Sequence, residues 1–345
     1  MHYDFIAFIG RFEPFHNGHL SVVRRALQNC DRLIVLIGSA QSARSTRNPF
    51  SSAEREVMLR AALGNDADRV VTRHIPDHLY NEGAWQSDVQ RNVSEVVIAA
   101  GKTLSDSSIG LIGHEKDDSS WYLHAFPQWN LIDVPFASGL SATELREHLF
   151  SEDNGALRLV EANVPKPVFE TLLAFRKTKT FAQLAEEYRH ISAYKTAWAA
   201  APYPPTFTTV DAVIVHSGHV LLVKRGAQPG KGLWALPGGF VNQQETLLTA
   251  ALRELKEETR IKLPLPVLRG SLKGQRVFDE PDRSQRGRTI THAFYFEFPS
   301  GDLPQVRGAD DAARARWVSL SEARQMRELL FEDHYFILEH FIGAS

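Results

Sequence analysis

The stretch FIAFIGRFEPFHNGHL, residues 5–20, joins an apolar run to a polar turn that carries two histidines three positions apart, His16 and His19. The run at 5–9 predicts a buried strand, and the residues from Gly18 onward have the spacing of a helix. A helix that follows a parallel strand begins with unpaired N–H groups, which bind anions. This turn is therefore the first candidate for a phosphate site.

Short apolar runs alternate with helical patterns along the first half of the chain. We expect strands at 4–10, 32–38, 69–76, 109–113 and 131–135, and helices at 18–30, 51–63, 81–100 and 141–149. Such alternation favours an α/β fold whose N-terminal part is a doubly wound parallel sheet of the Rossmann-like type. Ligands of these sheets bind beyond the carboxyl ends of the strands.

The rhythm changes after APYPP at 201–205, because closely spaced prolines are incompatible with a helix. Helical patterns precede it over 156–201. Beyond it, apolar runs at 210–215 and 220–224 flank HSGH, which is typical of a hairpin turn, and one strong helix follows. We therefore expect a first domain at 1–185, a helical segment and linker at 186–205, and an α+β domain at 206–345.

The composition is that of a globular protein without a dominant charge. Of 345 residues, 43% are hydrophobic and 23% are charged, and the formal net charge is −2. This balance provides no basic field for a nucleic-acid polymer. The single cysteine, Cys30, excludes an internal disulfide framework and a four-cysteine zinc site. We expect a cytoplasmic protein that binds small-molecule nucleotides, with no nucleic-acid or membrane partner; a homo-oligomer is left open.

The first motif is G-x-F-x-P-x-H-x-G-H, which residues 10–19 match at every fixed position. This string resembles the phosphate-handling signature of the HxGH nucleotidyltransferase superfamily. Four further segments resemble the archaeal-type nicotinamide-mononucleotide (NMN) adenylyltransferases, in the order expected for them: RNPFSSAERE at 47–56, YNEGAWQSDVQ at 80–90, GHEKDDSSWYLHAFPQW at 113–129 and LSATELR at 140–146. The resemblance implies attack of the NMN 5′-phosphate on the α-phosphorus of ATP, which gives NAD and pyrophosphate.

This chemistry needs positioning and neutralisation of negative charge more than a covalent nucleophile. Guanidinium groups grip phosphate bidentately, so Arg11, Arg47 and Arg146 are candidate phosphate clamps. Within the resemblance, His16 and His19 stabilise the α-phosphate, and magnesium bridges the triphosphate. The residues that it implies for nucleotide binding are Gly10, Phe12, Gly18, Ser141, Thr143 and Arg146, and those for NMN binding are Trp85 and Arg47. Ser141 and Thr143 also fit helix N-caps, and Trp85 also fits a buried helix aromatic; both readings stay open.

The second motif is GFVNQQETLLTAALRELKEETRI at 239–261. It fits the Nudix hydrolase box G-x5-E-x7-R-E-U-x-E-E-x-G-U with one departure, Arg260 in place of the last glycine. Glu254, Glu257 and Glu258 share one arc of a helix, where three like charges repel unless a cation lies among them. Hard carboxylate oxygens suit Mg²⁺, with Mn²⁺ as an alternative. We expect a metal site at Gly239, Glu254, Glu257 and Glu258; a solvated acidic face is the simpler alternative, but it does not account for the glycine and arginine spacing.

Arg260 stands where a glycine usually serves a left-handed turn at a helix end. We expect the turn to persist at some energetic cost, and the chemistry to survive because no ligand is lost.

The segment VFDEPDRSQRGRTITHAFYF at 277–296 resembles ADP-ribose pyrophosphatases that are fused to this kind of adenylyltransferase. The resemblance implies hydrolysis of ADP-ribose to AMP and ribose 5-phosphate. Arg283, Arg286 and Arg288, with Arg276 before them, are candidate diphosphate ligands; a solvated basic loop is the alternative.

Two other functions stay open at this point. The first domain could transfer a nucleotide to another phosphate acceptor, such as phosphopantetheine, since the HxGH signature is shared among such enzymes. The second domain could act on another nucleoside diphosphate conjugate or serve as an ADP-ribose sensor. The segment 47–56 and Trp85 favour NMN, and the complete set of carboxylates favours hydrolysis.

Overall fold

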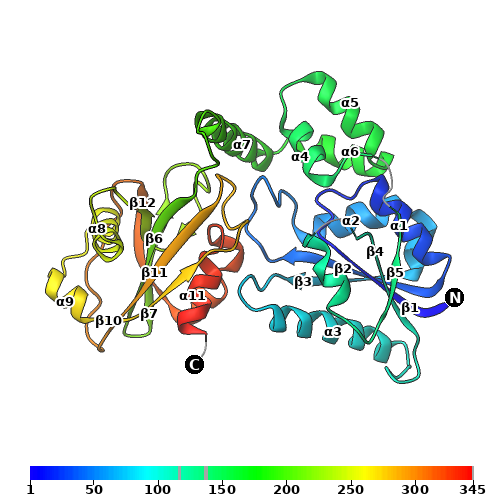
Figure 1. The fold of residues 1–345 in the computed structure, drawn as a ribbon, viewed down its shortest axis with the longest axis horizontal. Coiled ribbons are helices and arrows are strands. Elements are labelled where there is room, and N and C mark those ends of the chain that lie inside the picture. The colour runs from blue at the N-terminus through cyan, green and yellow to red at the C-terminus, as the bar shows by residue number, and fades with distance from the viewer. Residues whose placement is uncertain (116–117, 136–138, 344–345) are drawn as a thin grey trace. The chain divides into compact units, whose positions relative to one another are not determined.

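Strand β1 (Tyr3–Gly10) is the central strand of a five-stranded sheet. The order of the strands is β3 (Val70–Pro76), β2 (Cys30–Ala40), β1, β4 (Ile109–Gly113) and β5 (Asn130–Asp133). The computed structural model describes residues 1–115, 118–135 and 139–343. All strand pairs in this sheet are parallel, with Phe8 opposite Val35 on one side and Ile112 on the other. The predicted doubly wound parallel sheet is therefore confirmed (Figure 1).

Alternate residues of β1 face opposite layers of helices. Phe5, Ala7 and Ile9 belong to a buried apolar cluster that includes one side of helix α3 (Glu82–Ala99). Phe8 faces the other side, where its ring lies 6.3 Å from that of His19. Helices α1 and α2 cover that second face of the sheet (Figure 1). The sheet thus presents the start of α1 at the carboxyl end of its central strand.

The chain divides into two compact units, Met1–Ala185 and Glu186–Ser345. Helix α7 begins in the first unit and ends in the second. The remaining elements of the first unit and this helix are β2 (Cys30–Ala40), β3 (Val70–Pro76), β4 (Ile109–Gly113), β5 (Asn130–Asp133), α1 (Asn17–Leu27), α2 (Ser52–Leu63), α4 (Ala142–Phe150), α5 (Asn154–Asn163), α6 (Lys166–Phe175) and α7 (Lys179–Trp198), with short 3-10 turns at Gly64–Arg69 and Asp118–His124.

The second unit is built on a mixed sheet with the order β10-β11-β6-β7-β12, to which β8 and β9 add at β7 and β6. Strands β6 and β11 run parallel and the other pairs are antiparallel. Its elements are β6 (Phe207–His216), β7 (His219–Arg225), β8 (Trp234–Ala235), β9 (Gly238–Phe240), β10 (Leu272–Phe278), β11 (Thr289–Phe298), β12 (Ala312–Ser319), α8 (Leu247–Thr259), α9 (Leu265–Gly270), α10 (Leu320–Arg324) and α11 (His334–Ile342), with a 3-10 turn at Arg327–Leu329.

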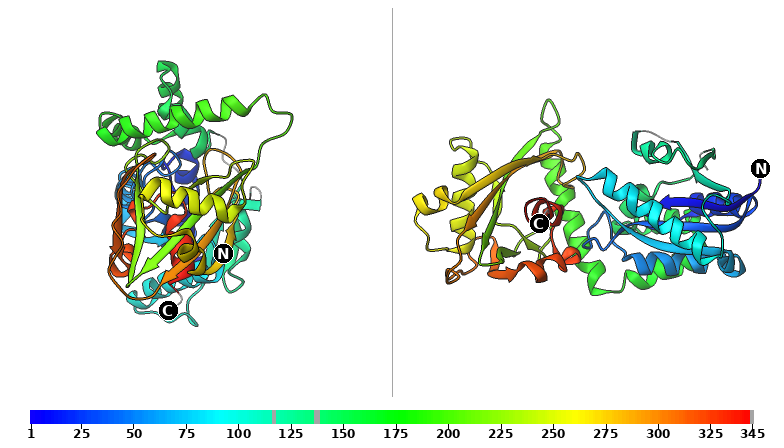
Figure 2. Two further views of the ribbon diagram at one scale, coloured as in Figure 1. Left: turned by 90° about the vertical axis from the view of Figure 1, so that its left-hand side faces the viewer. Right: turned by 90° about the horizontal axis from the view of Figure 1, so that it is seen from below.

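Two helices cover the two faces of this sheet. Helix α8 packs its apolar arc against alternate residues of β6 and β11, such as Val210 and Phe294. Helix α11 lies on the other face, where the rings of Phe341 and Tyr295 stack 5.4 Å apart. Figure 2 shows α8 in yellow and the α11 end of the chain in dark red on either side of the strands. The α+β prediction is confirmed for this unit.

Several boundaries agree closely with the sequence, and others differ. The strand at Ile109–Gly113 is as predicted, and the HSGH turn has both central residues in the left-handed region, Ser217 at φ 49° and Gly218 at φ 70°. Strand β5 ends at Asp133, two residues before the predicted end at Pro135. The helical region at 156–201 is three helices, and Pro165 caps the start of the second. Among the described residues, no helix is both long and apolar enough to span a bilayer.

Candidate active sites

The first candidate site begins at the turn between β1 and α1. His16 is the N-cap of α1, and its backbone N–H donates to Nδ1 of His19 at 3.3 Å. The two imidazole rings stack with their centroids 3.7 Å apart. Because Nδ1 of His19 accepts this hydrogen bond, the proton of the neutral ring lies on Nε2. The motif spacing therefore produces two adjacent imidazoles, and that of His19 has a defined donor atom.

Both histidines are neutral near pH 7. Burial lowers the pKa of His16 to about 4 and lowers the pKa of His19 well below its usual range, with His16 adding to the effect on His19. A phosphate oxygen that accepts from Nε2–H would favour the charged form and raise these pKa values. The pair is thus suited to bind an anion and to gain positive charge as negative charge develops on it.

The side chain of Phe12 and the absence of side chains at Gly10 and Gly18 shape this turn. Phe12 adopts φ 56°, and its ring is 1% exposed and lies 4.9 Å from that of His19. A Cβ at Gly10 would come within 2.9 Å of Phe12 Cζ, and one at Gly18 within 2.9 Å of His16 Cε1. Gly10 and Phe12 were predicted to bind nucleotide, but the Phe12 side chain faces the core. Gly10 makes room for the Phe12 ring, which packs against His19, and contact of these two residues with nucleotide stays a prediction.

Three predicted arginines gather around this turn. Arg146 lies on α4 and is 6% exposed; its Nη1 donates to the backbone oxygen of Glu13 at 2.7 Å and its Nη2 to Oγ1 of Thr143 at 3.1 Å. Burial, together with the nearby charges of Arg11 and Arg47, lowers the pKa of Arg146 to about 10. Cations held this close repel one another unless an anion lies among them. The fold therefore brings the three candidate clamps together.

A buried ion pair beneath the turn escaped the sequence analysis. Arg55 of α2 and Glu13 are each 1% exposed, with Nε and Oε1 3.0 Å apart. Arg55 also donates to the backbone oxygens of Arg11 and Gly38, each at 2.6 Å, and of Ser39 at 3.1 Å. Burial raises the pKa of Glu13 to about 8, against the opposing effect of Arg55. The sequence signal for this ion pair is a charged residue within each of two quoted segments: Glu13 in residues 10–19 and Arg55 in residues 47–56.

Ser141 and Thr143 have local structural roles. Ser141 is the N-cap of α4: its Oγ accepts from Glu144 N–H at 3.3 Å, and its own N–H donates to Glu144 Oε2 at 2.7 Å. Thr143 orients Arg146 through the hydrogen bond described above. Both side chains therefore serve the first turn of α4, which supports the N-cap alternative for Ser141; their contact with nucleotide stays a prediction.

Trp85 lies on α3 and is partly buried in an aromatic group. Its ring centroid lies 5.5 Å from that of Trp121, 6.4 Å from Tyr122 and 5.9 Å from Phe126. Trp121 is 44% exposed, so this group reaches the surface. Trp121 belongs to the quoted segment at 113–129 but was not singled out. Lys116 and Asp117 of that segment lie outside the described residues.

The second candidate site lies at α8 and β9. Arg253 donates to both carboxylate oxygens of Glu245, at 3.0 Å from Nε and 2.6 Å from Nη2. Its Nη1 also contacts Glu254 at 2.8 Å and Glu257 at 2.9 Å, and Nη2 donates to the backbone oxygen of Phe240 at 3.2 Å. These contacts explain the spacing between the first glutamate and the arginine of the box, because the guanidinium of Arg253 in α8 binds Glu245 in the loop before that helix. Within the part of the chain that the structure describes, no three acidic, histidine or cysteine side chains are already gathered around one metal position.

The donor set nevertheless fits a divalent cation. Glu258 is 7% exposed, and its Oε2 accepts from Gly238 N–H at 3.0 Å. Burial, with a smaller contribution from the charge of Glu254, raises the pKa of Glu258 to about 8. A Cβ at Gly239 would come within 2.6 Å of Glu254 Oε1, so only glycine leaves room for the Glu254 carboxylate next to β9. Hard oxygen ligands under mutual repulsion are the chemistry that Mg²⁺ or Mn²⁺ relieves.

Arg260 adopts the left-handed conformation predicted for it. It is the C-cap of α8 with φ 50° and ψ 26°, and its N–H donates to the Lys256 oxygen at 3.0 Å. The box turn is therefore retained without its glycine.

The predicted diphosphate-binding arginines do not all face the site. Arg283 is 3% exposed on its side chain and makes two hydrogen bonds to Asp333, at 2.8 and 2.7 Å. This buried bidentate pair holds the Nε–Nη2 edge of the Arg283 guanidinium in the core, and contact of Arg283 with a diphosphate stays a prediction. Arg286 lies with its guanidinium 5.2 Å from the ring centroid of Phe240, next to Gly239.

The other two arginines of this region contact the protein near the surface. The Arg288 Nη1 group donates to the backbone oxygen of Asp279. Arg276 lies 2.6 Å from Nδ1 of His340 and is exposed. Of the four, Arg286 is the one that the fold places against β9, the strand that contains Gly239 and Phe240.

A buried polar group behind β9 was also missed. Asp211 of β6 accepts from Thr291 Oγ1 at 2.6 Å, and Nε2 of His334 lies 3.9 Å from its Oδ1. Nδ1 of His334 accepts from the Leu236 N–H at 2.9 Å, and burial lowers the His334 pKa to about 3. The sequence signal for this buried group is Asp211, an aspartate within the apolar run at 210–215.

Comparison with known proteins finds a matching family for each half of the chain. The NUDIX domain family matches residues 205–341, and the cytidylyltransferase-like family matches residues 7–148. The nicotinamide/nicotinic acid mononucleotide adenylyltransferase of Acinetobacter baylyi is 34% identical over 189 residues, which cover 54% of this chain and 94% of that protein. The ADP-ribose pyrophosphatase of Methanocaldococcus jannaschii is 38% identical over 133 residues, which cover 39% of this chain and 71% of that protein.

Solved structures of one protein resemble the whole chain. The bifunctional NMN adenylyltransferase/ADP ribose pyrophosphatase of Francisella tularensis is 38% identical, with a TM-score of 0.90 over 99% of each chain. Its crystal structure complexed with AMP and Mn ion gives 36% identity and a TM-score of 0.89, again over 99% of each chain.

Proposed function

Because the chain belongs to the family of bifunctional NMN adenylyltransferase/ADP-ribose pyrophosphatases, we propose that it carries out both reactions, one in each compact unit. The observation that carries this proposal is the similarity over 99% of both chains, at 38% identity. It extends to both domains and to their order. A transferase for another acceptor or a non-hydrolysing sensor is not favoured by these relatives.

In the first reaction, an oxygen of the NMN 5′-phosphate attacks the α-phosphorus of ATP. A new P–O bond forms, the bond to the β-phosphate oxygen breaks, and pyrophosphate leaves with that electron pair; the product is NAD. Nε2–H of His19 donates to the α-phosphate together with the imidazole of His16, and both stabilise the charge that builds up there. Arg11, Arg47 and Arg146 hold the phosphates in line.

Residues around these histidines and arginines make smaller contributions to the first reaction. Thr143 keeps Arg146 in place, and Ser141 keeps the start of α4 in the geometry that presents it. Trp85 offers an aromatic face to the nicotinamide ring. We expect Mg²⁺ to accompany the triphosphate.

In the second reaction, water attacks one phosphorus of the ADP-ribose diphosphate. A P–O bond forms, the bridging P–O bond breaks, and the products are AMP and ribose 5-phosphate. Glu254, Glu257 and Glu258, with the backbone oxygen of Gly239, would hold Mg²⁺ or Mn²⁺. When bound, such a cation activates the water and neutralises the diphosphate. Arg253 fixes the helix that carries these carboxylates, and Arg286 faces the diphosphate from the side of Phe240.

Product analysis of the intact protein tests both reactions. With Mg²⁺ and ATP, we expect NAD and pyrophosphate from NMN, and we include the deamido form of NMN and phosphopantetheine as competing acceptors. With Mg²⁺ or Mn²⁺ and ADP-ribose, we expect AMP, and none after chelation of the metal. Pyrophosphate from phosphopantetheine but not from NMN would overturn the first assignment, and binding of ADP-ribose without AMP would overturn the second.

A further inference from the structure

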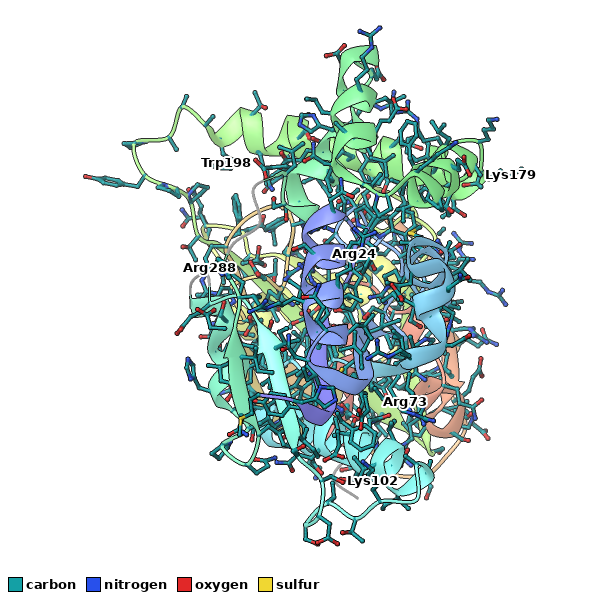
Figure 3. All side chains as sticks on the ribbon, turned by 90° about the vertical axis from the view of Figure 1, so that its right-hand side faces the viewer. Arg24, Arg73, Lys102, Lys179, Trp198 and Arg288 are labelled. Carbon is teal, nitrogen blue, oxygen red and sulfur yellow. The ribbon has the colours of Figure 1, made fainter. Side chains whose placement is uncertain are left out.

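Exposed cations and buried polar groups are distributed differently in this protein. Arg24 and Lys102, two exposed cations of the first unit, lie well apart from each other in Figure 3, so they do not form a common anion site. In the second unit, Asp211, Thr291 and His334 are each at most 7% exposed and lie close together. None of these three takes part in a step of the proposed reactions, although they lie behind β9, the strand of the proposed metal site.

The three residues that join β8 to β9 are each held by one hydrogen bond. The N–H of Leu236 donates to Nδ1 of His334 at 2.9 Å. Two residues on, the N–H of Gly238 donates to Oε2 of Glu258 at 3.0 Å. The proline between them has no N–H to donate, and its oxygen accepts from strand β6 at 2.8 Å. One imidazole and one metal-site carboxylate thus hold the two ends of the same short segment.

Gly238 and Gly239 have no side chains that could anchor them beside the carboxylates. A Cβ at Gly238 would come within 2.1 Å of the Val210 oxygen and 2.7 Å of Asp211 Oδ1, so no side chain fits there. A Cβ at Gly239 would come within 2.6 Å of Glu254 Oε1. The position of this backbone is therefore set by its own hydrogen bonds and by those of the residues just before it.

Buried contacts fix the position of His334. It is the first residue of α11, and its N–H donates to the Phe331 oxygen at 3.1 Å. Asp333, directly before it, is 0% exposed and accepts two hydrogen bonds from Arg283. The N–H of Phe331 donates to the Trp234 oxygen at 2.8 Å, so the chain before α11 also contacts β8. The imidazole therefore reaches the segment between β8 and β9 from a well-anchored helix start.

The environment of the ring favours the tautomer that can accept at Nδ1. Burial lowers the pKa of His334 to about 3, so the ring is neutral near pH 7. Because Nδ1 accepts from Leu236, the proton of the ring lies on Nε2, which is 3.9 Å from Oδ1 of Asp211. The other carboxylate oxygen accepts from Thr291 Oγ1 at 2.6 Å. An oxygen acceptor on the Nε2 side stabilises this tautomer.

We propose that His334 is a positioning residue of the Nudix metal site: its Nδ1 holds the Leu236 N–H and so keeps Gly238 and Gly239 beside the carboxylates of α8. This inference rests on the proposed metal-dependent hydrolysis of ADP-ribose. It adds a residue that the box motif does not include, since His334 lies 98 residues after Leu236. Replacement of residues that orient metal ligands typically weakens metal binding by about 10- to 100-fold.

Binding of Mn²⁺ to the intact protein without substrate, measured by the paramagnetic resonance signal of the free ion, tests the proposal. The binding that is lost in Glu258→Gln belongs to the Nudix site. In His334→Leu, which removes the acceptor, we expect the Mn²⁺ dissociation constant of this site to rise about tenfold or more. His334→Asn restores most of the affinity, because its Oδ1 takes the place of Nδ1. His334→Gln, whose acceptor lies one bond further out, restores less.

Steady-state hydrolysis of ADP-ribose separates positioning of the metal site from a general loss of structure. In His334→Leu, a saturating concentration of Mn²⁺ is expected to return kcat to near the wild-type value. The KM for ADP-ribose at that concentration should also match wild type, because the substrate contacts remain. A merely structural role would lower kcat by the same factor at every Mn²⁺ concentration.

His340→Leu is the matched control, because His340 is exposed on the same helix and contacts Arg276. It keeps the wild-type Mn²⁺ affinity, and denaturant unfolding verifies that each variant is folded. Wild-type Mn²⁺ affinity in folded His334→Leu would overturn the positioning role. If that variant does not fold, equal affinities in His334→Asn and His334→Gln would overturn it. A wild-type protein that binds Mn²⁺ but releases no AMP from ADP-ribose would instead overturn the proposed function itself.

Discussion

Arg55 Nε lies 3.0 Å from Glu13 Oε1 in the core of the first unit, where each side chain is 1% exposed. Helix α1, strand β2 and the start of α2 separate the two residues along the chain. Arg55 also donates to three backbone oxygens: that of Arg11, which directly follows β1, and those of Gly38 and Ser39 in β2. This pair is therefore the support on which the two histidines depend.

Removal of one partner leaves a buried charge without compensation. Arg55→Met is expected to lower the free energy of unfolding of the first unit by about 3–5 kcal/mol. Arg60→Ala on the same helix is the matched control: its ion pair with Glu56 is exposed, so we expect a change below about 1 kcal/mol. Denaturant unfolding provides the measurement, and equal losses in the two variants would contradict a supporting role for Arg55.

The two reactions should separate by mutation. His16→Ala is expected to reduce kcat/KM for NAD formation by about 100-fold or more, since it removes a group that stabilises the transition state, while ADP-ribose hydrolysis persists. Glu258→Gln should do the reverse. His2→Ala and Glu328→Gln change exposed residues of the same types and serve as controls. Loss of both activities in either folded variant would contradict separate sites.

Stability should depend on pH through His16. Its pKa in the folded protein is about 4, below the ordinary value of 6.5, so between these values the unfolded chain binds more protons than the folded one. The contribution is therefore fully present above pH 6.5 and is lost as the pH falls toward 4, by at most about 3 kcal/mol. Unfolding measured across this range should show a shallower pH slope in His16→Gln than in wild type. His2→Gln controls for loss of an exposed imidazole, and identical slopes in His16→Gln and wild type would rule out the effect.

Bound nucleotide should reduce the loss of stability at low pH that the buried histidines cause. A phosphate near Nε2 of His19 favours the imidazolium, so nucleotide binding is expected to take up protons. Calorimetric titration of ATP in two buffers of different ionisation enthalpy measures the uptake. In His19→Gln the uptake should decrease, and proton uptake that is the same in both proteins would show that these imidazoles do not contact phosphate.

Arg260→Gly should stabilise the second unit. The left-handed conformation at φ 50° costs an arginine about 1 kcal/mol, and glycine avoids it. The gain is partly offset by the greater freedom of glycine in the unfolded chain, so we expect up to about 1 kcal/mol in thermal or denaturant unfolding. ADP-ribose hydrolysis should be unchanged. Lys262→Gly, two residues on, is the comparison in which glycine should destabilise; a loss of stability in Arg260→Gly would contradict the strain.

The sequence alone determined the local parts of this protein. The strands, helices, HSGH hairpin and Arg260 turn follow from periodicity and from backbone preferences within a few residues, and each of the two motifs is one continuous stretch of sequence, residues 10–19 and 239–261. His16 and His19 meet because three positions along a helix start place them on one side. Glu254, Glu257 and Glu258 share an arc for the same reason.

The tertiary structure decided which charged groups are used for packing and which face a ligand. The local sequence predicts that Arg283 binds a diphosphate, but Asp333, 50 residues away, binds the Nε–Nη2 edge of its guanidinium in the core. Arg146 reaches the turn by its bond to Glu13, 133 residues before it. A buried charge must find its partner wherever the fold places one, and that choice depends on burial and on long-range contacts, which local sequence patterns do not encode.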